Sequence, residues 1–127
     1  MKFKQTMGLF FALLMLALAV SVAAASGPYT VYASVTTGSG AVQAKLVPGE
    51  FTVPAGKTAS IVKFQHDDPN SGYHSEKLGK NIYSVTQNAY MVDASGNPLF
   101  QLPPGVYRFF VGGSPGATGI LVYNLNP

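Results

Sequence analysis

The 127-residue chain contains no cysteine and no tryptophan, and only 10% of its residues are charged. The absence of cysteine excludes disulfide scaffolds, thiolate zinc sites and cysteine catalysis. An intrinsically disordered chain would be rich in charge and poor in aromatic residues, whereas this one is 47% hydrophobic and 12% aromatic. We therefore expect a single folded domain, which its length also supports.

The N-terminal residues have the three parts of a secretory signal peptide. A basic start is followed by an almost unbroken apolar run from Met7 to Val20 and by the small residues Val22-Ala23-Ala24-Ala25. The apolar run is shorter than the roughly 20 residues that span a bilayer, which disfavours a retained membrane anchor. We predict a cleaved signal peptide over residues 1–25 and a mature β-domain over residues 26–127, secreted or periplasmic.

The predicted mature chain carries little net charge. Eight basic residues minus Lys2 and Lys4 leaves six, against five acidic residues. The six are scattered along the chain, whereas binding to nucleic acid needs a clustered basic surface. We predict no nucleic-acid partner and no membrane span in the mature chain.

The mature residues indicate short strands separated by turns. Tyr29 to Thr36 alternates apolar and polar residues, as a half-buried strand does. Turn residues follow at near-regular spacing, as in Pro54-Ala55-Gly56 and from Asp93 to Asn97. No stretch combines helical periodicity with caps. The prediction is an all-β fold, a single antiparallel β-sandwich of jelly-roll or Ig-like type with about seven or eight short strands.

Further strands are predicted over residues 58–64, 82–92, 106–111 and 118–125, the second of them broken near Asn88. The last of these has neither a charge nor a proline, which usually protect an edge strand from pairing. At a sheet edge it would add to a neighbouring sheet and cause self-association. In a central position its two faces would be buried.

The order of three segments resembles secreted bacterial β-sandwich accessory modules of the pre-peptidase C-terminal type. The segments are Phe51 to Lys57, Tyr90 to Asn97 and Leu102 to Phe109. The resemblance implies a non-catalytic appendage of exported proteins, some of which bind calcium or carbohydrate. This chain lacks the paired-Asp strand motif of those modules, so no functional residue is carried over.

Polar residues concentrate between Gln65 and Lys77, in a segment without strand character. A connection of this length is typical of functional or disordered loops. Carboxylates and carbonyls suit calcium, whereas two histidines with a carboxylate suit zinc or copper. A solvated loop of ordinary turn residues is the alternative, and it needs no cofactor. The candidate metal ligands are His66, Asp67, Asp68, His74 and Glu76.

The sequence shows no catalytic constellation. The strained Gly-x-Ser-x-Gly turn that exposes a nucleophilic serine in many hydrolases does not occur. Two histidines near acids are compatible with acid–base chemistry, but nothing in the sequence places a nucleophile beside them. We predict that the protein is not an enzyme.

From Asn81 to Pro127 the only ionised side chains are Asp93 and Arg108, although this half is rich in aromatic residues. These rings either fill the core or form an exposed surface, and exposed aromatic surface marks association or ligand binding. Tyrosines on a flat sheet also suit stacking on sugar rings. The aromatic residues concerned are Tyr83, Tyr90, Phe100, Tyr107, Phe109, Phe110 and Tyr123.

Together these features predict a small exported binding or accessory module of the cell envelope or extracellular space, with a protein or carbohydrate partner. The alternatives are a self-assembling envelope or matrix subunit and a periplasmic metal-binding protein that uses the segment from His66 to Glu76.

We expect the exported protein to begin within two residues of Ser26, because the small residues before it fit the signal peptidase. Intact-mass measurement of the exported protein checks this. A mature species that still carries Met7 to Val20 would contradict secretion by this route.

Overall fold

The computed structural model describes residues 25–40 and 43–127, so all of the predicted signal peptide except Ala25 lies outside the described residues. The described residues form ten β-strands and no helix. None of them therefore belongs to a helix that could cross a membrane. The strands are β1 (Ser26–Thr37), β2 (Ala44–Val47), β3 (Gly49–Val53), β4 (Thr58–Asp68), β5 (Tyr73–Ser75), β6 (Ile82–Ser84), β7 (Ala89–Tyr90), β8 (Gln101–Leu102), β9 (Gly105–Phe109) and β10 (Thr118–Asn126).

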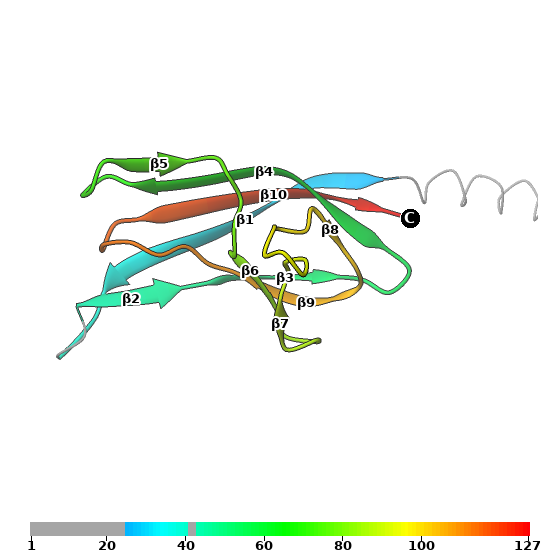
Figure 1. The fold of residues 1–127 in the computed structure, drawn as a ribbon, viewed down its shortest axis with the longest axis horizontal. Coiled ribbons are helices and arrows are strands. Elements are labelled where there is room, and N and C mark those ends of the chain that lie inside the picture. The colour runs from blue at the N-terminus through cyan, green and yellow to red at the C-terminus, as the bar shows by residue number, and fades with distance from the viewer. Residues whose placement is uncertain (1–24, 41–42) are drawn as a thin grey trace, which may run out of the picture.

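The strands form two antiparallel sheets, which confirms the all-β prediction at that level. Sheet A has the order β2-β1-β10-β4-β5, with β8 also paired to β4, and sheet B has the order β3-β9-β6-β7. The long strands β1, β4 and β10 run along the long axis of the molecule (Figure 1). Four strands, β5, β6, β7 and β8, have three residues or fewer. Strands this short show no periodicity in the sequence, which is why fewer strands were expected.

Alternation along the strands directs one face of each sheet to the core. In β1, Val31, Ala33 and Val35 are buried while Tyr32 is exposed, as the period of two predicts. In β10, Leu121 and Tyr123 are buried in the same way.

The two sheets share one core. Phe51 of sheet B packs on Tyr123 of sheet A with ring centroids 4.9 Å apart, and it stacks on Tyr107 at 5.4 Å. Farther along, Phe64 of sheet A meets Phe109 of sheet B edge-on at 6.0 Å. These rings belong to a single cluster of buried residues drawn from both sheets.

The structure places β10 in the centre of sheet A and excludes the edge position considered for residues 118–125. β10 pairs with β1 on one side and with β4 on the other. Its backbone groups are therefore engaged on both sides, and it is not available to add to a neighbouring sheet. Only one face of the strand is fully buried, since Ile120 and Val122 on the other face are partly exposed.

The prediction of a long loop from Gln65 to Lys77 is wrong. β4 extends to Asp68 and pairs with β5, so that only residues 69–72 form the turn between them. The sequence does not predict this hairpin, because residues 65–68 are all polar and lack the alternation of a half-buried strand. Backbone pairing to β5 and β10 holds them in the sheet instead. After β5, residues 76–81 connect sheet A to β6 in sheet B (Figure 1).

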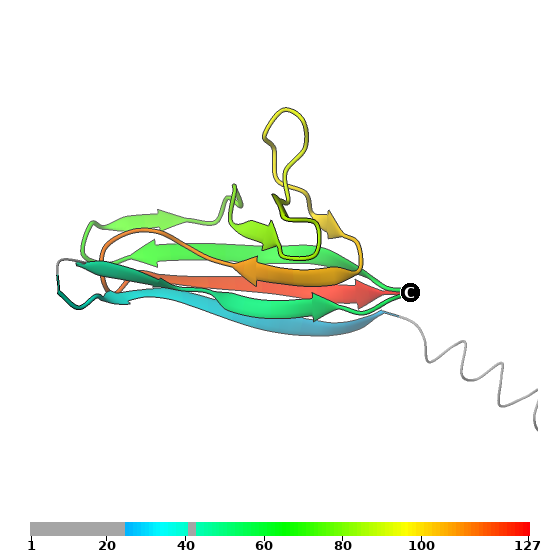
Figure 2. The ribbon, with the colours of Figure 1, turned by 90° about the horizontal axis from the view of Figure 1, so that it is seen from below.

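The predicted turns are confirmed. Lys57 N–H donates to the Pro54 carbonyl at 3.2 Å, and Gly96 N–H donates to the Asp93 carbonyl at 3.0 Å. The second turn projects from the body of the molecule as the yellow loop in Figure 2. The predicted break near Asn88 is also present, because β6 and β7 are joined by a turn in which Asn88 has a positive φ of 54°.

The buried face of β10 gives a test of this arrangement. Leu121 is completely buried between the sheets, so Leu121→Ala should lower the free energy of unfolding by about 2–5 kcal/mol. The neighbouring Val122→Ala removes a partly exposed side chain and should cost about 1 kcal/mol or less. Urea unfolding of both variants measures the difference, and equal losses would contradict the assigned faces.

Candidate functional site

Three aromatic side chains gather on the face of sheet B that points away from the core. We call Tyr83, Tyr90 and Phe110 the aromatic face. Tyr83 and Tyr90 are paired across β6 and β7, and their ring centroids lie 5.1 Å apart at an interplanar angle of 76°. Tyr90 in turn meets Phe110 at 5.9 Å and 63°. The edge-to-face packing stabilises this arrangement of the three rings.

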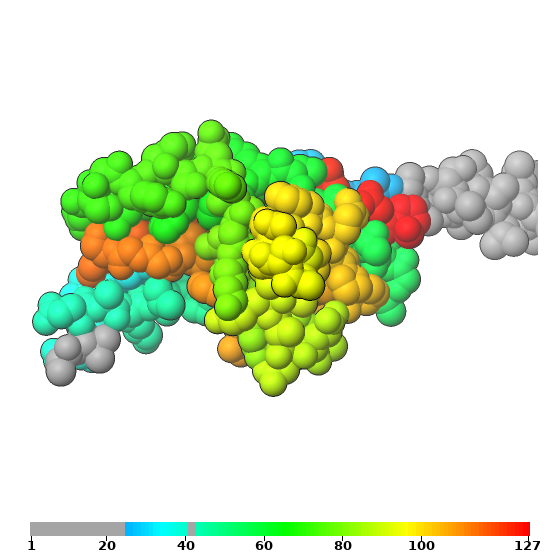
Figure 3. Space-filling view, in the orientation of Figure 1, coloured from blue at the N-terminus to red at the C-terminus, as the bar shows by residue number. Residues whose placement is uncertain are grey.

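Strand alternation sends these rings outward. Ile82 and Ser84 are buried on either side of Tyr83, so the tyrosine lies on the opposite face. The turn at Asn88 folds β7 back beside β6, because Asn tolerates a positive φ and its side-chain oxygen accepts a hydrogen bond from the Tyr83 hydroxyl. In the space-filling view, the segment from β6 to the Asp93 turn forms the lime and yellow lobe on one face of the molecule (Figure 3).

The aromatic face lines a shallow hollow with a volume of about 430 Å³. Leu46 and Pro48 add apolar surface from β2 and the link that follows it, and Arg108 adds a cation from β9. The volume lies within the roughly 300–1,000 Å³ range of small-molecule sites. The hollow therefore combines ring faces with a few polar groups at its border.

One cation, Arg108, lines the hollow, and a second, Lys80, contacts one of its rings. The Arg108 Nε lies 3.6 Å from the Glu50 Oε2, and both side chains are exposed. The Lys80 Nζ lies 4.5 Å from the centroid of the Tyr90 ring, a cation–π contact that orients the ring. Arg108, Glu50 and the Tyr83 hydroxyl supply hydrogen-bond donors and acceptors beside the rings.

The structure divides the predicted metal ligands between the two faces of the β4–β5 hairpin. Asp67 and His74 contact each other on one face. His66 and Asp68 lie on the other face, because neighbouring residues of a strand point to opposite sides. Glu76 lies beyond the end of β5. Within residues 25–40 and 43–127, no three His, Asp or Glu side chains come close enough together to hold a metal ion.

His66 and Asp68 bind the glycine-rich connection between β9 and β10 instead. The His66 Nε2 lies 2.8 Å from the Gly112 carbonyl. Asp68 is buried and accepts hydrogen bonds from the Ser114 backbone N–H at 2.9 Å and from its hydroxyl at 2.6 Å. Gly113 has a φ of 121°, and a Cβ there would lie 2.6 Å from the Asp68 Oδ2. Glycine is therefore required where the connection crosses the carboxylate.

These contacts change the pKa values of the hairpin acids. The two hydrogen bonds from Ser114 lower the pKa of Asp68 to about 2. The hydrogen bond between Asp67 and His74 lowers the pKa of Asp67 and raises the pKa of His74. An Asp67 carboxylate and a charged His74 therefore stabilise each other. Two of the five predicted metal ligands are thus paired with each other across the hairpin.

The seven aromatic residues that the sequence analysis considers together lie in three different places in the structure. Tyr107, Phe109 and Tyr123 belong to the core. Phe100 is exposed in a different hollow, beside β4. The sequence did not indicate the lining residues Leu46 and Pro48 or the Lys80 contact with Tyr90. No local pattern marks these residues, because they reach the rings only through the folding of the chain.

Comparison with protein-family models, curated proteins and solved structures finds no match to this chain.

The Asp68 contacts predict a dependence of stability on pH. A carboxyl whose pKa falls on folding stabilises the fold above its unfolded pKa, and the gain is lost as the pH falls through the folded value, here about 2. Asp68→Asn should therefore be less stable than the wild type at pH 6, with a difference that shrinks between pH 4 and pH 2. Urea unfolding at pH 6, 4 and 2.5 measures it, with Ser114→Ala as a second variant. A difference that does not vary with pH would contradict the assignment.

Proposed function

We propose that this chain is an exported, non-catalytic binding module and that it takes a carbohydrate on the aromatic face of sheet B. In this proposal sheets A and B pack face to face as a β-sandwich of jelly-roll or Ig-like type. The shared aromatic core supports that arrangement, since Phe51 and Phe109 of sheet B meet Tyr123 and Phe64 of sheet A.

The observation that carries the proposal is the cluster of Tyr83, Tyr90 and Phe110 on an outward face. Tyr90 is 39% exposed, although burial of a large ring in the core would stabilise the fold by more. The three rings border a hollow that the protein itself leaves open. A surface of this kind is more useful for binding than for folding.

The chemistry of the hollow suits a sugar. The C–H face of a pyranose ring is apolar and flat, and it packs on an aromatic ring as another apolar ring does. The hydroxyls at its edge need donors and acceptors, which Arg108 and the Tyr83 hydroxyl supply in the lining of the hollow and Glu50 supplies beside Arg108. Neither Asp67 nor His74, the nearest approach to an acid–base pair, lines this hollow.

Export is part of the proposal and is supported by the predicted signal peptide. Ser26, the expected first residue of the mature chain, is also the first residue of β1 and pairs with Leu125 of β10. Removal of residues 1–25 would therefore leave every described strand intact.

Binding to polysaccharides tests the proposal. The protein produced from the full chain should sediment with at least one insoluble polysaccharide from a panel of cellulose, chitin and peptidoglycan. Tyr90→Ala should weaken that binding about tenfold, because an aromatic contact contributes about 0.5–1.5 kcal/mol and roughly 1.4 kcal/mol corresponds to a factor of ten.

Tyr32→Ala is the matched control. Tyr32 is 68% exposed on the outer face of sheet A, away from the hollow, so its removal should leave binding unchanged. Thermal unfolding of both variants checks that they fold. Failure to bind any of the polysaccharides, or equal binding by Tyr90→Ala and the wild type, would refute the proposal.

A further inference from the structure

One stretch of β4 lacks a neighbour on the outer side of sheet A. On that side β8 pairs with Ala59 and Ser60, and the Ile61 N–H donates to the Phe100 carbonyl at 2.8 Å. Pairing resumes at His66 with β5. In the part of the chain that the structure describes, residues 62–65 have no strand partner there, and we call these four residues the β4 gap.

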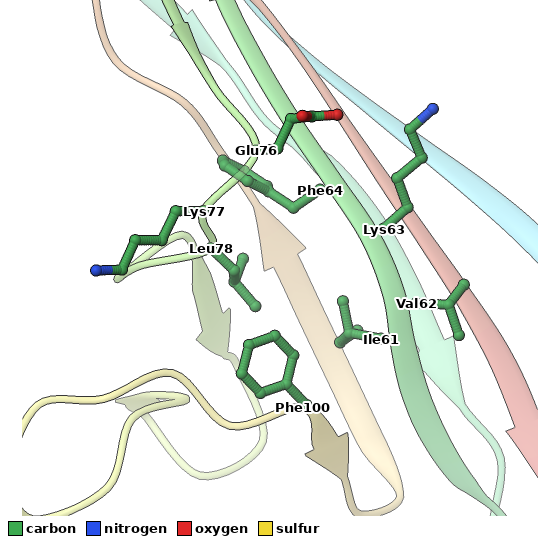
Figure 4. Close-up of a pocket in the computed structure, with 8 residues that line it drawn as sticks. All are labelled: Ile61, Val62, Lys63, Phe64, Glu76, Lys77, Leu78 and Phe100. Carbon is green, nitrogen blue, oxygen red and sulfur yellow. The ribbon is translucent and has the colours of Figure 1, made fainter.

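A second hollow, of about 550 Å³, opens beside the β4 gap. Figure 4 shows Leu78 and Phe100 next to each other on one side of β4, with Ile61 near them on the strand itself. Leu78 and Ile61 are buried, whereas Phe100 is 52% exposed. The hollow therefore has an apolar floor directly next to unpaired strand backbone.

The charges around this hollow are mainly positive. Lys63 and Lys77 line it with a single acid, Glu76. Lysine on an edge strand opposes pairing with a partner of the same charge. Lys63 lies within the β4 gap, so a strand that pairs there is favoured when it carries acidic side chains.

We propose that the β4 gap binds an extended, acidic peptide segment of a partner protein by strand addition. The segment's backbone would supply the hydrogen bonds that residues 62–65 lack on this side, and an apolar side chain would fill the hollow at Phe100. The residues directly before and after it point to the opposite face of the added strand, so acidic side chains there would lie near Lys63, which is exposed on that face of β4. At about 3.3 Å per residue the gap accepts roughly four residues between β8 and β5.

Charge argues against a second copy of this chain as the occupant. Two copies that paired through their β4 gaps would bring both Lys63 side chains and both Lys77 side chains to one interface, and like charges there oppose association. A partner that presents acidic residues gains attraction at the same place. The proposal is independent of carbohydrate binding, because the two hollows share no lining residue.

Three labelled peptides test the proposal with the wild-type protein. The first is acetyl-Val-Asp-Phe-Asp-Val-amide, the second has lysine in place of both aspartates, and the third is the acidic peptide with alternate amides N-methylated. Fluorescence anisotropy should show binding of the first and at least tenfold weaker binding of the other two. The lysine peptide reports on charge, and the methylated peptide reports on backbone pairing.

Protein variants locate the site. Phe100→Ala should weaken binding of the acidic peptide, and a Lys63→Glu, Lys77→Glu double variant should reverse the preference toward the lysine peptide. Lys45→Glu, on β2 at the opposite edge of sheet A, is the control for a charge reversal away from the hollow and should leave the preference unchanged. Tyr90→Ala should also leave it unchanged, which separates this site from the aromatic face.

Several outcomes would overturn the proposal. Absence of binding to all three peptides would do so, as would equal affinity for the acidic and the N-methylated peptides, since that would show apolar contact without strand addition. Sedimentation that shows a dimer of the wild type and a monomer of Phe100→Ala would assign the β4 gap to a second copy instead.

Discussion

The packing of Tyr123 on Phe51 joins the two sheets, and the positions of both surface sites depend on it. Tyr123 belongs to β10 at the centre of sheet A, and Phe51 belongs to β3 at one edge of sheet B. Because Phe51 also stacks on Tyr107 of β9, the contact reaches the middle of sheet B. The inner faces of the sheets are thereby occupied, and the alternate residues of the same strands must point outward.

This alternation determines what each surface contains. In β9, Tyr107 and Phe109 enter the core while Arg108 between them faces outward beside Glu50. In β6, Ile82 and Ser84 are buried and Tyr83 joins the aromatic face. The outward surface of sheet B thus carries rings with a few charged groups. The outer edge of sheet A carries unpaired backbone, an apolar floor and lysines. This difference in chemistry is the basis for proposing two different classes of ligand, a sugar and an acidic peptide.

The β4–β5 hairpin shows how a polar segment can be structural. His66 and Asp68 hold the glycine-rich connection that leads from β9 into β10, and Asn70 donates a hydrogen bond to the Pro115 carbonyl in the same connection. The connection passes from sheet B to sheet A, so these contacts fix the point at which the chain changes sheets. The charge of Asp68 is stabilised by hydrogen bonds from Ser114, and a metal ion is not needed for this arrangement.

The sequence by itself determined the all-β class, the alternation in β1 and the turns at Pro54 and Asp93, because these depend on local periodicity and on residues with strong turn preferences. It also named the tyrosines of the aromatic face, but it could not separate them from the core rings. Only the tertiary structure decided that β10 is central, that residues 65–68 are a strand and that Phe100 borders the β4 gap. Those features depend on pairing between segments far apart in the chain, where backbone hydrogen bonds act whatever side chains the strands carry.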